Sequence, residues 1–379
     1  MSKEKRRVPK LRFPGFTEDW EQRKLGDVTN IKTGSRNQQD SVTNGQYPFF
    51  IRSEKIEKLD RYDFDTEAIL VPGDGRIGEI FHYYNGKFAL HQRVYKVDNF
   101  KGVDAFFLLY LFQCSFKEHA LRLNAQGTVP SLRLPMFTEW NICIPSLQEQ
   151  IGIGRLLNKI ELMITLHQRK LDNLKLKKKA LLQKLFPKNG ERYPELRFSG
   201  FTDAWEQCKL SDITEVIMGQ SPSSKNYTDN PNDDILVQGN ADLKDGKVVP
   251  RLWTKEITKT IDKGGIILTV RAPVGDVAKT DYKVVLGRGV AGIKGNDYIY
   301  QFLQKLQYNR YWVSLSSGST FESINSNDIK DLIIDIPSIE EQTKISMLLN
   351  NVNSIITLHQ RKLDHLKLQK KALLQQMFV

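Results

Sequence analysis

The sequence predicts an α+β protein made of two tandem, pseudo-twofold-related α/β domains separated by two long antiparallel coiled-coil helices. Three observations lead to this fold class: a long internal repeat, a heptad pattern in each copy, and short apolar runs between the helical stretches. The clearest copies are Thr165–Phe186, TLHQRKLDNLKLKKKALLQKLF, and Thr357–Phe378, TLHQRKLDHLKLQKKALLQQMF. Shared helix composition would not produce so many identical positions, so the chain contains a duplicated unit.

The duplication extends to the start of each domain. The segment Pro9–Gln22, PKLRFPGFTEDWEQ, returns at Pro194–Gln207 as PELRFSGFTDAWEQ, after a polar, turn-rich linker at residues 187–193. One repeat unit is therefore a domain followed by a helix. We expect four segments: a first domain at residues 1–145, a central helix at 146–186, a second domain at 187–337 and a C-terminal helix at 338–379.

Apolar and β-branched runs inside both domains predict strands. They cover residues 68–71, 88–90, 93–97 and 140–144 in the first domain, and residues 266–270, 284–286, 290–293 and 332–336 in the second. Each domain also has a helix-like stretch, at residues 105–123 and 298–315. The loops between these elements differ between the two halves, which suggests one scaffold with two different binding faces.

Both long helices have the same predicted start. Ser146 and Ser338 are N-cap candidates, and Glu149 and Glu341 follow three residues later, which is the spacing of a capping box. In that motif, the glutamate side chain reaches back to the backbone of the cap residue.

An apolar seam then advances in alternating steps of four and three residues, the heptad pattern of a coiled coil. It runs from Ile153 to Leu185 in the first helix and from Ile345 to Met377 in the second. A helix of about 40 residues is about 60 Å long. An antiparallel pair is favoured because the domain between the helices, roughly 150 residues, then bridges only a short gap. This arrangement puts one domain at each end.

Polar residues interrupt the seam, and leucines lie outside it. His167, His359, Lys178 and Lys370 are interpreted as seam residues that set register, although the two lysines could instead face a third helix from a partner. The leucines outside the seam would be exposed on a two-helix rod, so we expect partner helices to cover them. These are Leu156, Leu166, Leu176 and Leu182, with Leu348, Leu358, Leu368 and Leu374 in the second copy.

Composition narrows the class of protein. The net charge of +12 favours a polyanionic partner, although a solvated basic surface would give the same balance. The three cysteines have no metal-binding spacing, which suggests a reducing compartment and no zinc site. The charged start and the short apolar runs predict neither a signal peptide nor a membrane span. We therefore expect a soluble, cytoplasmic protein.

The one tempting catalytic motif is Gly73–Gly78, GDGRIG, which fits the dinucleotide pattern G-x-G-x-x-G. A dinucleotide site needs a helix next, but residues 79–86, EIFHYYNG, are typical of a strand and turn. The second half keeps only Gly275 at the matching place, so a structural loop is the favoured interpretation. The chain shows no P-loop, no H-E-x-x-H zinc motif and no Asn-Pro-Pro-aromatic loop, and we predict no catalytic residues and no metal site.

The chain resembles the specificity subunits of type I restriction–modification enzymes. The resemblance covers almost the whole length. It rests on IPSLQEQ at Ile144–Gln150 and IPSIEEQ at Ile336–Gln342, on the LHQRKL repeats, and on the F-x-G-F-T-x-x-W domain openings.

This resemblance implies a subunit without catalytic residues, in a complex that acts as a site-specific deoxyribonuclease and adenine methyltransferase. Its two target-recognition domains would each read one half of a bipartite, gapped site in double-stranded DNA. Its helices would set the spacer and dock two methyltransferase subunits, and endonuclease/translocase subunits would join for restriction of unmodified DNA. The subunit itself would hold no cofactor, since S-adenosylmethionine, ATP and Mg²⁺ would be used by its partners.

Base contacts are expected from forked polar side chains in the loops that differ between the halves, because these side chains match base edges. Any single one could instead be an ordinary solvated loop residue. The candidates in the first domain are Arg36, Asn37, Gln38, Arg76, Gln92, Arg93, Ser131 and Arg133. Those in the second are Gln220, Ser223, Lys225, Asn226, Arg271, Arg288, Ser319 and Asn325.

Two other functions stay open at this point. A coiled-coil scaffold that binds protein partners at both ends would show only weak, salt-sensitive DNA binding without sequence preference. A nucleotide-dependent enzyme would use Gly73–Gly78 and lose cofactor binding on Gly75→Ala. The symmetry of the two halves argues against the enzyme, because the glycine motif occurs only once.

Overall fold

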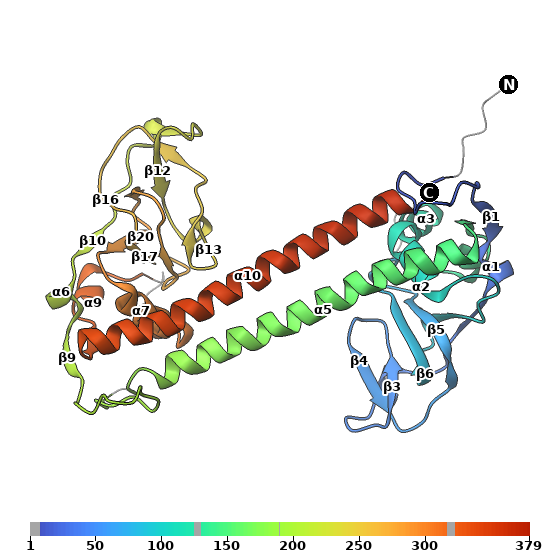
Figure 1. Cartoon of the computed structure of the whole chain (residues 1–379), viewed down its shortest axis with the longest axis horizontal. Coiled ribbons are helices and arrows are strands. Elements are labelled where there is room, and N and C mark those ends of the chain that lie inside the picture. Colours follow the sequence, from blue (N-terminus) through green and yellow to red (C-terminus); the bar gives the residue numbers. More distant parts are fainter. Residues whose placement is uncertain (1–7, 125–129, 189, 317–322) are drawn as a thin grey trace. The chain divides into compact units, whose positions relative to one another are not determined.

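A computed structural model describes residues 8–124, 130–188, 190–316 and 323–379. The chain divides into two compact units, shown with their elements in Figure 1. Unit 1 contains Met1–Gln168 and Arg361–Val379, and unit 2 contains Arg169–Gln360. Two long helices, α5 (Leu147–Lys184) and α10 (Ile339–Met377), each contribute residues to both units. Each unit therefore holds one domain, one end of α5 and the opposite end of α10.

Unit 1 is built on a six-stranded sheet with the strand order β2-β7-β5-β6-β3-β4. These strands are β2 (Asn30–Thr33), β3 (Tyr47–Phe50), β4 (Ile56–Leu59), β5 (Phe64–Pro72), β6 (His82–Leu90) and β7 (Val94–Asp98). A separate ribbon pairs β1 (Glu21–Lys24) with β8 (Asn141–Ile144). The helical elements are α1 (Leu25–Val28), η1 (Gln38–Asp40), α2 (Ala105–Leu111), the π-helical turn η2 (Phe112–Phe116), α3 (Lys117–Leu123) and α4 (Leu134–Thr138).

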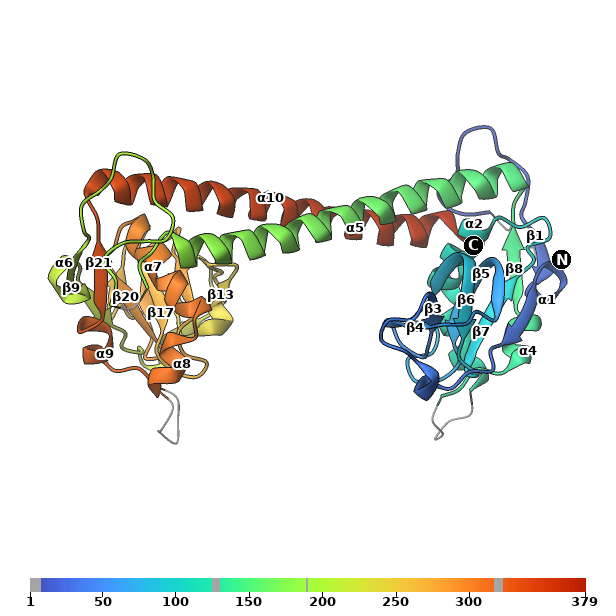
Figure 2. The ribbon, with the colours of Figure 1, turned by 90° about the horizontal axis from the view of Figure 1, so that it is seen from below.

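Strand β5 shows how the sheet of unit 1 is buried on both faces. Ala68 and Leu70 pack into a cluster between strands, with Phe88 of β6. Their neighbours Ile69 and Val71 point to the other face and join a larger core with the residues of α2. Figure 2 shows α2 between these strands and the first turns of α5. The period-two alternation of a strand therefore serves two cores, which explains why this stretch is continuously apolar in sequence.

Unit 2 has shorter strands, which form two sheets instead of one. One sheet has the order β10-β20-β17-β18-β14-β13 and another the order β11-β15-β12-β19-β16. Its strands are β9 (Glu206–Lys209), β10 (Val216–Met218), β11 (Tyr227–Thr228), β12 (Asp234–Val237), β13 (Leu243–Lys244), β14 (Lys247–Val248), β15 (Trp253–Thr254), β16 (Thr260–Ile261), β17 (Ile266–Thr269), β18 (Val277–Lys279), β19 (Val284–Leu286), β20 (Val290–Ile293) and β21 (Ile333–Ile336). Its other elements are α6 (Leu210–Ile213), η3 (Ser224–Asn226), η4 (Asn240–Asp242), α7 (Asp297–Tyr308), α8 (Tyr311–Ser316) and α9 (Ser326–Lys330).

The predicted strands are confirmed in both domains, each within a few residues of an observed strand. The two predicted helices are also present, but each is divided. In unit 1 the π-helical turn η2 separates α2 from α3, and in unit 2 Asn309 and Arg310 separate α7 from α8. Arg310 has a positive φ of 55°, a left-handed conformation that ends a helix.

Both long helices pack as an antiparallel pair requires. In unit 1, Ile153 and Leu157 near the start of α5 share a core with Met377 and Phe378 at the end of the chain. In unit 2, the end of α5 shares a core with the start of α10 through the seam residues Leu185, Ile345 and Leu349. The alternating seam predicted from the heptads thus supplies buried residues at both ends.

The helix starts differ from the predicted capping box. The backbone N–H of Glu341 donates to the Ser338 hydroxyl at 3.3 Å, so Ser338 acts as an N-cap. The Glu341 carboxylate, however, accepts two hydrogen bonds from Arg197, at 2.8 and 2.9 Å. A charge-assisted bidentate pair is stronger than a bond to a cap N–H. Glu341 therefore binds Arg197 in the opening segment of the domain and not the cap residue of the helix.

Unit 1 contains the matching pair. Arg12 donates to both carboxylate oxygens of Glu149, at 2.6 and 2.8 Å. Glu149 is fully buried, and its hydrogen bonds raise the pKa of Arg12 further above its ordinary value. Each repeated L-R-F opening is therefore fastened to the repeated helix start that follows it in the same unit.

The seam lysines also contact their own domains, contrary to the suggestion of a third helix from a partner. Lys178 donates to the side-chain oxygen of Gln304 at 2.8 Å. Lys370 donates to that of Gln113 at 2.9 Å and forms an ion pair with Glu161 at 2.6 Å. Gln304 and Gln113 belong to domain elements, and Glu161 belongs to the other long helix. Both lysines therefore join a long helix to its domain.

Half of the leucines predicted to be exposed are not. Leu182 is fully buried in the core of unit 2, and Leu348 packs against the same core. Leu156 and Leu374 pack against the core of unit 1. These four lie near helix ends, where the domain covers more than the two-helix seam. In contrast, Leu166, Leu176, Leu358 and Leu368 are 64 to 67% exposed.

Candidate nucleic-acid interface

Four loops of unit 1 that contain predicted DNA-contacting residues meet at one place. The first two are the loop after β2 and the turn between β6 and β7. The backbone N–H of Arg36 donates to Leu90 O at 3.2 Å, and the N–H of Gln92 donates to Arg36 O at 2.8 Å. The Gln92 side chain also donates to the Asn37 side chain at 2.6 Å. Arg36, Asn37 and Gln92 are therefore neighbours.

The other two loops join at the end of β5. The N–H of Gly73 donates to Arg93 O at 2.8 Å, and the N–H of Leu132 donates to Gly73 O at 2.6 Å. An isolated antiparallel bridge pairs Asp74 with Ser131. The loops that hold Arg93, Ser131 and Arg133 are thus connected through Gly73.

Unit 2 assembles the equivalent loops with the same backbone contacts. Gln220 N–H donates to Leu286 O at 2.8 Å, and Val270 N–H donates to Gly289 O at 2.9 Å. An antiparallel bridge pairs Arg271 with Ser323. The loops after β10, β17 and β19 and the segment before α9 therefore form one face in unit 2, as their counterparts do in unit 1.

One glycine in each unit allows the loop after the first sheet strand to approach so closely. A Cβ at Gly34 would lie 2.0 Å from the carbonyl oxygen of Leu90, and one at Gly219 would lie 2.1 Å from that of Gly287. Any side chain would push these loops apart. We call the two loop clusters face 1 (residues 34–38, 51–54, 73–76, 91–93 and 131–133) and face 2 (residues 219–226, 238–239, 271, 287–289 and 323–325).

The candidate arginines of face 1 differ in how many of their nitrogens are already bonded. Arg36 donates through Nε and Nη2 to Asp63, at 3.0 and 2.7 Å, which raises its pKa. Arg76 donates through Nε to Glu79 and through Nη1 to Glu54, at 2.8 and 3.0 Å. Hydrogen bonds from Lys117 and Arg76 in turn lower the pKa of Glu79 to about 2. A base contact by Arg36 or Arg76 would compete with these pairs.

The Arg93 side chain makes a longer contact with its carboxylate than Arg36 and Arg76 make with theirs. Its Nε lies 3.8 Å from Asp74 Oδ2, and its side chain is 62% exposed. Gln38 and Arg133 are exposed as well, and Ser131 is half-buried at its bridge to Asp74.

On face 2, a carboxylate organises two of the candidates. Glu256 accepts from the backbone N–H of Ser223 at 2.8 Å and from the side chain of Asn226 at 2.7 Å. These hydrogen bonds lower the pKa of Glu256, the Asn226 contribution being the larger. Lys225, between them, is exposed.

The remaining candidates of face 2 have mixed positions. Gln220, Arg271 and Arg288 are exposed. Asn325 caps α9, because its side-chain oxygen accepts from the N–H groups of Asn327 and Asp328. These two hydrogen bonds occupy the side-chain oxygen of Asn325, which favours a structural role. Ser319 lies outside the described residues.

Sequence reasoning missed a fifth loop in each face. Arg52 follows β3 and lies 3.2 Å from Asp74 Oδ2 through its Nη1. Gln238 follows β12, the strand that pairs in parallel with β19 as β3 pairs with β6. Its side chain donates to the Tyr227 hydroxyl at 2.8 Å. A polar residue one or two positions after a short apolar strand was the signal available in the sequence for both.

The Gly73–Gly78 motif forms a loop of face 1 and no nucleotide site. The next element is strand β6, so the helix N-terminus that would hold a pyrophosphate is missing from this position. Gly78 has a φ of 66°, and a Cβ there would lie 2.6 Å from Lys117 Cα. The glycines therefore serve turn geometry and close packing, as the favoured interpretation predicted.

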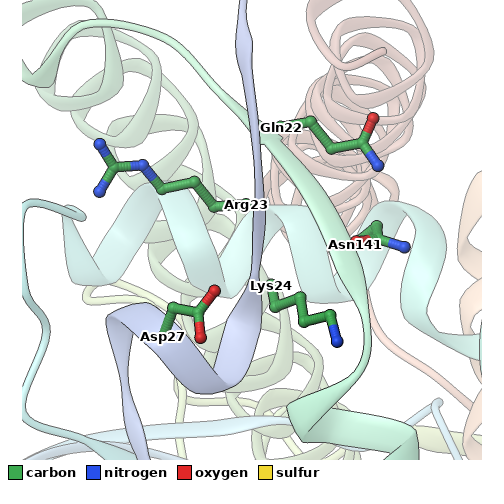
Figure 3. A pocket seen from close by; sticks show the side chains of 5 residues that line it. All are labelled: Gln22, Arg23, Lys24, Asp27 and Asn141. Atoms are coloured by element: carbon green, nitrogen blue, oxygen red, sulfur yellow. The ribbon is translucent and has the colours of Figure 1, made fainter.

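A shallow groove beside the β1–β8 ribbon does not bring its polar side chains together. It is lined by Gln22, Arg23, Lys24, Asp27 and Asn141, whose side chains spread apart rather than converge (Figure 3). Within the described ranges, no group of three or more His, Cys, Asp or Glu residues could hold a metal ion. In the same ranges no helix is long and apolar enough to cross a membrane.

Comparison with known families identifies the family of this chain. The model of the type I restriction modification DNA specificity domain matches residues 17–176 and again residues 202–368. The chain belongs to this family. Its two matched regions coincide with the two repeat units found in the sequence, each a domain followed by most of one long helix.

Curated specificity subunits of type I restriction enzymes are similar to this chain. A putative type I restriction enzyme specificity subunit, MjaX, from Methanocaldococcus jannaschii is 26% identical, over 94% of this chain and 92% of that protein. The EcoDI specificity subunit from Escherichia coli is 27% identical over 55% of this chain and 46% of its own length.

Solved structures agree in fold. The S subunit of a type I restriction–modification system from M. genitalium matches with a TM-score of 0.74 and 15% identity, covering 98% of this chain and 99% of that one. This match confirms the predicted fold class of two tandem domains with two long helices.

Proposed function

We propose that this specificity subunit reads a bipartite, gapped sequence in double-stranded DNA, with face 1 contacting one half-site and face 2 the other. The observation that carries the proposal is the pair of faces. The same backbone contacts assemble both, from Arg36–Leu90 in one unit to Gln220–Leu286 in the other, yet they present different polar side chains. One scaffold with two sets of forked side chains suits the reading of two different half-sites.

The charge balance supports DNA as the ligand. A net charge of +12 supplies the phosphate contacts that give affinity, and the loop side chains supply base contacts that give sequence preference. Of the predicted contacts, Gln38, Arg93, Arg133, Lys225, Arg271 and Arg288 are exposed on the two faces.

The long helices supply the second part of the proposal, which is the docking of methyltransferase subunits. Leu166 and Leu176 on α5 and Leu358 and Leu368 on α10 are about two-thirds exposed. Large apolar side chains repeated along a helix favour coverage by a partner. Endonuclease/translocase subunits would join this complex, and S-adenosylmethionine, ATP and Mg²⁺ would act in the partners.

DNA methylation mapping tests the function directly. Cells would express this chain with the methyltransferase encoded beside it, and adenine methylation would be mapped across the genome. We expect methylation at a single gapped sequence with two half-sites. If the subunits assemble but methylation shows no sequence preference, the proposal is wrong and a protein-binding scaffold becomes the better explanation.

A length change in the helices tests whether they set the spacer. One helical turn would be inserted near Asn173 in α5, and one near His365, its repeat position in α10. Because a turn adds about 5.4 Å to each helix, we expect a changed spacer between two unchanged half-sites. An altered half-site with the original spacer would contradict this role.

A further inference from the structure

Face 1 contains one carboxylate that lies between two arginines from different loops. Asp74 Oδ2 is 3.2 Å from Arg52 Nη1 and 3.8 Å from Arg93 Nε. The Asp74 side chain is 18% exposed, whereas those of Arg52 and Arg93 are 45% and 62% exposed. The anion thus lies beneath two cations that face solvent.

The contact with Asp74 leaves both terminal nitrogens of Arg93 available for a base contact. Its Nε faces Asp74, so Nη1 and Nη2 remain available at the exposed end of the side chain. Two parallel N–H donors from one arginine match the O6 and N7 acceptors of guanine, the commonest specific contact in the major groove. Arg36 and Arg76 each have Nε and one terminal nitrogen engaged by carboxylates, so neither presents that pair without breaking a bond.

The surrounding backbone fixes both members of the Asp74–Arg93 pair. Arg93 O accepts from Gly73 N–H at 2.8 Å, and Asp74 is bridged to Ser131. The carboxylate and the guanidinium therefore start from adjacent, hydrogen-bonded segments. An arginine held this way loses less conformational freedom on binding than a free one.

We propose that Arg93 reads a guanine in the half-site bound by unit 1 and that Asp74 is the positioning residue that aims it. The inference rests on the proposed function. Two cations on one carboxylate leave a local excess of positive charge, which favours the electronegative O6 and N7 edge of guanine. Arg52 holds the second side of Asp74 and adds to this charge.

Face 2 has no copy of this arrangement. Its matching backbone contacts place Arg271 where unit 1 has Asp74, and Gly289 where unit 1 has Arg93. The guanine requirement from Arg93 therefore belongs to one half-site only.

The test uses the full chain assembled with its methyltransferase subunits and a pool of random DNA duplexes, from which bound duplexes are sequenced. We expect the wild-type complex to fix a guanine at one position of one half-site. Arg93→Ala should reduce that preference about tenfold to a hundredfold, and leave the other half-site unchanged. Arg93→Lys should keep most of the affinity but lose the preference, because lysine lacks the planar fork.

Asp74→Asn supplies the readout for positioning. It keeps the size of the side chain and removes its charge, so we expect a severalfold weaker preference at the same guanine and at no other position. Arg251→Ala is the matched control. It removes an exposed arginine that donates through Nε to Asp242 at 2.9 Å, but in unit 2, and must leave this guanine unchanged.

The outcomes separate the two levels of inference. If the wild-type complex selects no gapped sequence, the proposed function fails. If it selects one but every position survives Arg93→Lys and Asp74→Asn, only the role of Arg93 is overturned. If Arg93→Ala abolishes binding, Arg93→Lys decides: retained binding with a lost guanine preference supports the role, and a retained preference overturns it.

Discussion

Units 1 and 2 share their internal fastenings and differ in their exposed faces. The Arg12–Glu149 pair of unit 1 returns as Arg197–Glu341 in unit 2, with two hydrogen bonds in each. On the faces, by contrast, Asp74 and Arg271 occupy equivalent bridge positions with opposite charge. The comparison separates the contacts that hold each domain together from the side chains that would contact the proposed ligand.

One more pair of equivalent contacts belongs to the shared scaffold. Gln150 in unit 1 and Gln342 in unit 2 each donate to the carbonyl of the proline that precedes the helix, Pro145 and Pro337, at 2.8 and 3.0 Å. In the repeated P-S-x-x-E-Q segments, the glutamate thus binds the domain opening and the glutamine fixes the turn at the proline. Ser338 also caps its helix.

The largest effects are expected from the repeated arginine–glutamate pairs. Arg197→Ala would leave the Glu341 carboxylate, 1% exposed, buried without its cation. Breaking a buried pair in this way costs about 3 to 5 kcal/mol. We expect Arg197→Ala to destabilise unit 2 and Arg12→Ala to destabilise unit 1 by similar amounts, measured by hydrogen exchange of each unit in the full chain.

A double variant gives the control for this comparison. In Arg197→Ala combined with Glu341→Leu no charge remains buried, so most of the lost stability should return. An equal loss in the single and double variants would mean that packing of the arginine, rather than pairing of the charge, holds the domain opening. A loss spread equally over both units would contradict the assignment of each pair to its own unit.

Much of the fold could be predicted from the sequence because its signals are periodic and occur twice. The heptad seam located both helices, and the apolar runs at residues 68–71 and 266–270 located central strands of both sheets. What periodicity cannot reveal is the partner of a side chain. Glu149 fits a capping box by spacing, but its partner Arg12 is 137 residues away. Leu182 lies outside the heptad seam and is buried by its domain.

The candidate interface was predictable to the level of loops but not of single residues. Comparing the two halves picked out the loops that hold Arg36, Gln92 and Arg93, and the structure brings these together. Sequence alone could not tell that Arg36 is engaged by Asp63 while Arg93 presents two terminal nitrogens. It also missed Arg52, because its contact with Asp74 joins two loops that are distant in sequence.

The seam lysines are one place where the two scaffolds themselves differ. Lys370 has the carboxylate of Glu161 beside it, whereas the repeat position of Glu161 in α10 is Asn353. Lys178, 5% exposed, is left with the neutral Gln304 and the ring of Tyr308, 5.8 Å away. Burial without an anion lowers the pKa of Lys178 from 10.5 to about 8.

The smallest predicted effect on folding stability follows from the missing anion beside Lys178, and it depends on pH. Below about pH 8, Lys178 is charged in both folded and unfolded chains, and the folded state bears the full cost of burying the charge. Between that pH and the unfolded pKa of 10.5, the unfolded chain binds more protons, so stability should rise with pH. At about 1.4 kcal/mol for each unit between these two pKa values, the rise is on the order of 3 kcal/mol.

Lys178→Met isolates this contribution from other groups in unit 2, among them Lys305, whose pKa is also lowered by burial. The variant should be more stable than wild type at pH 7, and the difference should disappear above about pH 10.5, as followed by denaturant unfolding at several pH values. Lys370→Met should do the reverse at pH 7, because it leaves Glu161 without its cation, at a cost of about 1 kcal/mol. Equal effects of the two methionines would mean that Glu161 contributes nothing, and that both lysines are tolerated in the same way.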